Sequence, residues 1–111
     1  MFELVSEKKP IRTKVTFKYP ADKGEVKKTF IALFLMISID EYNELLKKED
    51  DQLFFERVMT DWDDIADENG DKIEFTKATL KQLLSEKRVR SAMVQSYMDF
   101  YHGKDELVRK N

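Results

Sequence analysis

Residues 11–19 alternate between apolar and polar side chains, and this alternation limits the possible folds more than any other feature of the sequence. A period of two, with β-branched and aromatic residues on one side, indicates a strand with one face in water. Pro20 and Gly24 then predict a turn over residues 20–24, because proline cannot continue a strand ladder and glycine tolerates positive φ. A second strand is expected from residue 25, which predicts an antiparallel hairpin over residues 10–36.

The second strand ends in an apolar run, Phe30 to Ile37. Both faces of this part of the strand are apolar, so one face is expected to meet the core. The other face should meet either the helices of the same chain or a partner. The run is less than half the length that a helix needs to cross a bilayer, so a membrane protein is not expected.

The pattern changes to helical spacing after residue 37. Ser38 and Glu41 form an S-x-x-E capping box, which predicts a helix start at Ser38. An acidic cluster over residues 49–51 favours a second helix start through the helix dipole. Apolar residues then recur at steps of three and four up to Trp62, which predicts an amphipathic helix that ends near Asp61.

Two further helices are expected after the strong turn dipeptide Asn69-Gly70. Thr76 is the expected N-cap of a short helix that carries three leucines, and Ser85 is expected to cap a last helix over residues 86–102. Gly103 follows at the C-cap position, where a left-handed residue ends a helix.

The order of strand, strand and then four helices predicts an α+β fold. The expected organisation is a polar lead-in over residues 1–9, a single domain over residues 10–103 and a charged C-terminal tail over residues 104–111. A chain of 111 residues suits one such domain.

The net charge of −2 hides an uneven distribution. Residues 1–37 hold eight Lys and Arg against four Asp and Glu, and residues 75–111 hold the same numbers. Residues 38–74 hold four against fourteen. This acidic middle is either a solvated surface or a surface that attracts a basic partner, and it disfavours nucleic acid. The absence of cysteine and of an apolar leader segment suits a reducing cytosol.

The sequence contains no complete catalytic or metal-binding motif. Residues 67–75 resemble half of an EF-hand loop, but Ile65 and Thr76 would then occupy the first and twelfth positions, which must supply carboxylates. His102 is the one histidine, and at a helix C-terminus it is expected to be structural. Glycine-rich phosphate loops are absent. We therefore expect no enzyme activity and no cofactor.

Three cations, Lys87, Arg88 and Arg90, gather where the last helix begins. Cations at this position could contact DNA phosphates, so a DNA-binding regulator of the helix-turn-helix type remains an alternative function, although the acidic middle would repel DNA. The three cations also oppose the helix dipole slightly at that end.

The helical segments hold more aromatic and methionine side chains than one narrow core stripe needs. Adjacent aromatic residues such as Phe54 and Phe55 point about 100° apart on a helix, so one of each pair is free to face outward. These side chains belong either to the core or to a surface that binds apolar helices of a partner. The candidate partner-binding residues are Leu53, Phe54, Phe55, Met59, Trp62, Met98 and Tyr101.

Four short motifs follow one another in the second half of the chain. They are the segment Val58-Met59-Thr60-Asp61-Trp62-Asp63-Asp64-Ile65, the segment Asp67-Glu68-Asn69-Gly70, the segment Ile73-Glu74-Phe75-Thr76 and the segment Leu80-Lys81-Gln82-Leu83-Leu84. Their order resembles the pattern of phage tail assembly chaperones, and the N-terminal hairpin and the last helix are similar as well. The resemblance covers about residues 11–103.

The resemblance implies a protein that is made in an infected bacterium or from a prophage and is absent from the finished virion. It implies that the chain binds the tape measure protein in the host cytoplasm and keeps it soluble during tail assembly. The tail tube protein and a second copy of the chain are further candidate partners, and membranes and nucleic acids are not. A structural tail completion or connector protein of the virion is the alternative.

Overall fold

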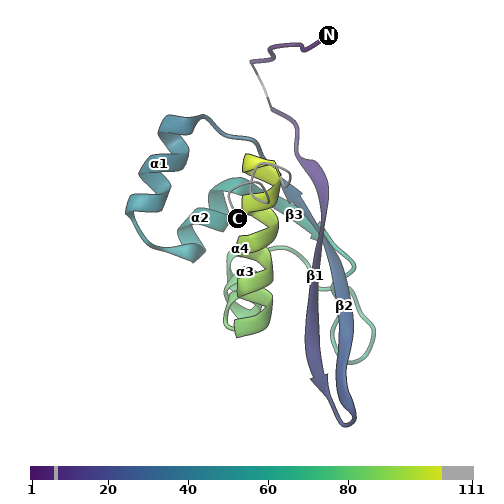
Figure 1. Ribbon diagram of the computed structural model, residues 1–111. Helices are drawn as coiled ribbons and strands as arrows, with labels where there is room; N and C mark the ends of the chain where they lie inside the picture. Colours follow the sequence, from purple (N-terminus) through teal and green to yellow (C-terminus); the bar gives the residue numbers. More distant parts are fainter. Residues whose placement is uncertain (7, 104–111) are drawn as a thin grey trace.

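A computed structural model describes residues 1–6 and 8–103. The chain forms β1 (Ile11–Ala21), β2 (Gly24–Phe34), α1 (Ile39–Lys47), α2 (Asp51–Val58), β3 (Met59–Asp63), α3 (Lys77–Leu84) and α4 (Lys87–His102). The described part thus has an antiparallel sheet at its N-terminal side and four helices, which confirms the α+β prediction. Figure 1 shows α4 beside the sheet and α1 at the periphery. The predicted tail over residues 104–111 lies outside the described residues.

The β1–β2 hairpin is confirmed, but its turn is tighter than predicted. The pairing runs from Ile11 opposite Phe34 to Ala21 opposite Gly24, so only two residues separate the strands. Pro20 lies inside β1, opposite Glu25, rather than in the turn. Since β1 is an edge strand of the sheet, proline is tolerated there without the loss of a ladder hydrogen bond. Gly24 has a φ of 86°, which the turn requires.

The sheet has a third strand that the sequence pattern did not predict. The second helix ends at Val58 rather than near Asp61, and residues 59–63 pair with β2 as an antiparallel strand. Trp62 therefore lies on a strand, opposite Ala32, and does not close a helical stripe. The apolar spacing of Val58, Met59 and Trp62 fits a helix equally well, and pairing with β2 decides between the two.

The predicted helix starts at Ser38 and Thr76 are confirmed, and Asp50 caps α2. Each side chain accepts a hydrogen bond from a backbone N–H in the first turn of its helix. The prediction for Ser85 is wrong, because Ser85 continues the last turn of α3 and its hydroxyl donates to the Gln82 carbonyl at 2.6 Å. Glu86 instead precedes α4, without a side-chain cap.

The core lies between the inner face of the sheet and the helices. Val15, Ala32 and Phe34 from the sheet are fully enclosed, and so are Leu80 from α3 and Met93 from α4. The outer face of the sheet carries Ile31 and Leu33, which are half-buried and lie outside this core cluster. Over the described residues, none of the helices combines the length and the apolar character needed to cross a bilayer.

Candidate functional site

Four of the seven predicted partner-binding side chains belong to the core. Phe54 and Trp62 are 9% and 2% exposed, and Phe55 and Met59 are enclosed almost completely. All four are core residues in this fold, so their assignment as contact residues is corrected. Leu53 is exposed at 38%, and Met98 and Tyr101 are half-buried on α4.

Met98 and Tyr101 meet α1 along a line that we call the α1–α4 seam. Tyr42 and Leu46 of α1 and Val94, Met98 and Tyr101 of α4 form it, and Ile39 lies on the same face of α1. The rings of Tyr42 and Tyr101 are stacked with their centres 4.2 Å apart. The Tyr42 hydroxyl lies 3.0 Å from the Met98 sulfur and 3.0 Å from His102 Nε2. His102 therefore has the structural setting that was predicted for it.

The outer side of the seam is apolar and exposed. Ile39 and Leu46 are 67% and 42% exposed, and they lie on either side of Tyr42 at helical steps of three and four. Leu46 also lines a shallow hollow together with Phe54, Val94 and Met98. At the seam, the exposed Leu46 therefore lies beside the flexible side chain of Met98, and the core ring of Phe54 lies beneath them.

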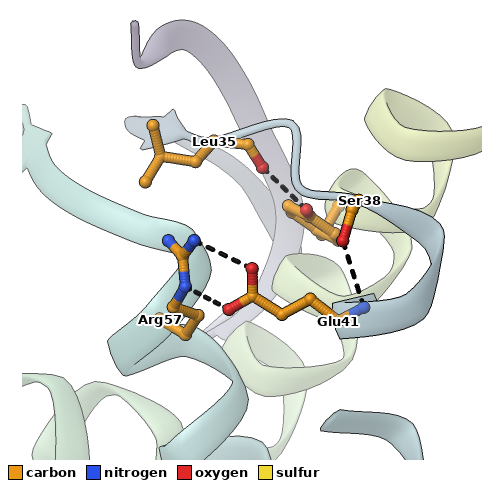
Figure 2. A network of polar contacts seen from close by, with 5 residues as sticks. Leu35, Ser38, Glu41 and Arg57 are labelled. Carbon is orange, nitrogen blue, oxygen red and sulfur yellow. Dashed lines mark hydrogen bonds and ion pairs between the residues drawn. The ribbon is translucent and has the colours of Figure 1, made fainter. Parts of the chain in front are cut away.

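Polar contacts hold α1 in place at its first turn (Figure 2). The Ser38 hydroxyl accepts from the Glu41 amide at 3.2 Å, while the Glu41 carboxylate pairs with Arg57 of α2 through two hydrogen bonds, one of them 2.9 Å long. Glu41 thus makes an ion pair rather than the second half of the predicted capping box. The Tyr97 hydroxyl donates to the Leu35 carbonyl at 2.7 Å, and the Tyr101 hydroxyl donates to the Ile37 carbonyl at 3.1 Å.

The seam tyrosines stay neutral well above neutral pH. Burial, and secondarily the neighbouring Tyr101, raises the pKa of Tyr42 above its ordinary value. Burial also raises the pKa of Tyr97 and the pKa of Tyr101. A desolvated phenol resists ionisation because the low-dielectric surroundings disfavour the charged form. The phenol rings of the seam therefore add no charge to it.

The segment that resembles half of an EF-hand forms a backbone turn. Asp67 Oδ1 accepts from the amides of Asn69 and Asp71, at 2.9 and 3.0 Å, and Gly70 takes a φ of 83°. Among the described residues, no three His, Cys, Asp or Glu side chains lie close enough together to hold a metal ion.

Ile39 and Leu46 were not among the predicted partner-binding residues. Leu46 was expected in the apolar stripe of this helix with Tyr42 and Leu45, and Ile39 was not named, although it lies three residues before Tyr42. A helical apolar stripe normally faces the core, so neither was expected at a surface. Here Tyr42 and Leu45 supply the buried face of α1, and the outer part of the stripe remains uncovered.

Comparisons with known protein families, with characterised proteins and with solved structures found no match for this chain.

Proposed function

We propose that this chain is a non-catalytic assembly chaperone of the phage tail type, and that it binds apolar helices of the tape measure protein at the α1–α4 seam. The observation that carries the proposal is the exposed Leu46, which lines one hollow with Met98, while the exposed Ile39 lies on the same face of α1. An amphipathic helix that is laid along such a surface buries its own apolar stripe.

The chemistry of the seam suits a partner whose segments vary in sequence. Methionine has a flexible, polarizable side chain and fits apolar surfaces of different shapes. Each contact is expected to be weak, because a few aliphatic groups bury little area compared with a stable protein interface. Many copies along one long helical chain would still give strong overall binding through avidity.

The direct experiment is co-expression of this chain with the tape measure protein that is encoded nearby, followed by a solubility assay and co-purification. We expect the wild-type chain to keep the tape measure protein in solution and to co-purify with it. An insoluble and unbound tape measure protein would refute the proposal. Recovery of the chain in purified virions would favour the structural tail role instead.

A pair of matched variants tests the location of the site. Ile39→Ser with Leu46→Ser removes the exposed aliphatic groups of α1, and we expect binding to weaken by on the order of tenfold or more. Ile11→Ser with Val26→Ser changes two comparably exposed side chains on the hairpin, 53% and 41% exposed, and serves as the control. Equal binding by the two variants would place the site away from the seam.

A further inference from the structure

The outer face of the sheet lies outside the core over the described residues. Side chains alternate between the two faces of a strand, and the inward set, which includes Val15, Ala32 and Trp62, is buried. The outward set on the three strands is exposed or half-buried, and none of its members belongs to the core cluster or packs against it. Figure 1 shows the helices to one side of the hairpin.

Two successive rows across this outer face have the same order of chemistry. Each row has a cation on β1, an aliphatic side chain on β2 and a carboxylate on β3. The pairing register gives Arg12, Leu33 and Asp61 in the first row and Lys14, Ile31 and Asp63 in the second. The face therefore has a positive margin, an apolar centre and a negative margin.

The charges of the two margins are only weakly paired within one copy. Arg12 reaches across β2 to Asp63 at 3.3 Å, and these side chains are 60% and 42% exposed. An exposed pair of this kind contributes less than about 1 kcal/mol, so its loss costs little. Lys14 and Asp61 have no oppositely charged side chain within 4 Å among residues 1–6 and 8–103. Both margins can therefore pair with charges on another molecule.

A face with one positive and one negative margin is complementary to a second copy of itself. When two sheets face each other across a two-fold axis that runs parallel to β2, β1 of each copy lies over β3 of the other. The positive margin of each copy then meets the negative margin of the other, and the apolar centres meet on the axis. From this pattern we infer that two copies of the chain pack their outer sheet faces together and form a symmetric dimer.

The register of the rows specifies the contacts of this dimer. Lys14 of each copy lies over Asp63 of the other copy, and Arg12 lies over Asp61. Facing sheets keep their strand directions within about 30°, so two rows that are about 7 Å apart both stay aligned. Lys27 lies about 13 Å from Ile31 along β2, where the twisted hairpins of the two copies have diverged and repel each other weakly.

The interface is small, so the dimer is expected to be weak. Strands of these lengths present roughly 400 Å² of sheet face per copy, which is about half of a standard protein interface. We expect a dissociation constant in the micromolar range or above, and added salt should raise it because the ion pairs lie at the margins. The α1–α4 seam lies on the helices, so the dimer does not depend on the proposed chaperone function.

The test is sedimentation velocity of the full chain at concentrations up to about 1 mM, since a millimolar dissociation constant is still a measurable association. The cation-row variant is Arg12→Glu with Lys14→Glu, and the anion-row variant is Asp61→Lys with Asp63→Lys. We expect each variant to raise the dissociation constant by on the order of tenfold or more. The control, Lys81→Glu with Lys87→Glu, makes the charge change of the cation-row variant at exposed helix positions and should associate as the wild type does.

Mixing the two defective variants gives the decisive result. Both margins are negative in the cation-row variant and positive in the anion-row variant, so an equimolar mixture should form a heterodimer at least as readily as the wild type forms its dimer. A mixture of folded variants that stays monomeric would overturn the proposal. A wild-type chain that is monomeric up to about 1 mM would overturn it as well, and so would a cation-row variant that associates as the wild type does.

A third variant keeps the test valid if the anion-row variant does not fold. Asp61 and Asp63 each accept a hydrogen bond from the next backbone amide, at 2.8 and 3.0 Å, and the anion-row variant loses both. Ile31→Thr with Leu33→Thr leaves these contacts and all charges in place, and threonine suits a strand. We expect this variant to keep its melting temperature within a few degrees and to dimerise on the order of tenfold more weakly. Dimerisation equal to that of the wild type would overturn the proposal.

Discussion

Two aromatic clusters in this protein differ in what surrounds them. Trp62 on β3 packs edge to face against Phe75, with ring centres 5.0 Å apart, and its indole N–H donates to the Ile73 carbonyl at 2.8 Å. Tyr42 and Tyr101 stack at 4.2 Å, and the Tyr101 hydroxyl donates to the Ile37 carbonyl at 3.1 Å. Each cluster thus ties a backbone carbonyl to an aromatic ring.

The two clusters differ in how much of their side chains is exposed to solvent. Trp62 is 2% exposed and belongs to the core, whereas Tyr101 is half-buried and stacks on Tyr42. Loss of an enclosed ring should destabilise the whole domain. Loss of a ring at the periphery should mainly release the element that it holds, because local opening costs less where few apolar groups are buried. If the seam binds a partner as proposed, α1 is free to adjust while the Trp62 cluster keeps the fold.

The largest expected effect comes from Trp62→Ala. Removal of an enclosed indole leaves a cavity and an unpaired Ile73 carbonyl, which should lower the free energy of unfolding by about 3–5 kcal/mol. Urea denaturation followed by circular dichroism measures this change. An unchanged midpoint would mean that Trp62 lies at the surface.

Tyr101→Ala should have a smaller and more local effect. The lost ring stacking and the lost hydrogen bond together amount to about 2 kcal/mol. Amide hydrogen exchange should show loss of protection in α1, while the protection of β2 and of the middle of α4 falls much less. Uniform loss of protection across the chain would show that the two clusters are equivalent.

Alkaline pH should weaken the contacts of Tyr42. Burial raises the pKa of this phenol in the folded state, so its contribution is complete below the unfolded value of about 10 and is lost as the pH rises further. One such group lowers the free energy of unfolding by at most about 1.4 kcal/mol per pH unit. Denaturation curves of the wild type should therefore fall more steeply above pH 10 than those of Tyr42→Phe, and parallel curves would refute this.

The smallest expected effect is that of Glu41→Gln, which breaks the ion pair with Arg57 at the first turn of α1. Both side chains are more than one third exposed, so the loss should be about 0.5 kcal/mol. Salt should reduce the difference between variant and wild type, because exposed charges are screened. A loss comparable with that of Tyr101→Ala would show that polar contacts, rather than ring stacking, hold α1.

The local signals in the sequence were sufficient for most of the fold. The inward face of β1 follows from its alternation, and the starts of α1 and α3 follow from side chains that cap their own helices. The candidate site was harder to predict. Periodicity identifies which helical side chains are apolar, but it does not tell which of them a neighbouring element covers, so Phe54 and Phe55 were assigned to a surface and Ile39 was overlooked.

The sequence by itself determined the α+β class, the hairpin, the capped starts of α1 and α3 and the turn at Asn69-Gly70, because each depends on residues that are close along the chain. The tertiary structure decided that residues 59–63 form a strand, since that outcome depends on the unpaired edge of β2. It also decided which apolar side chains of α1, namely Ile39 and Leu46, remain exposed. Burial depends on contacts between segments that are distant in sequence, and no local pattern encodes them.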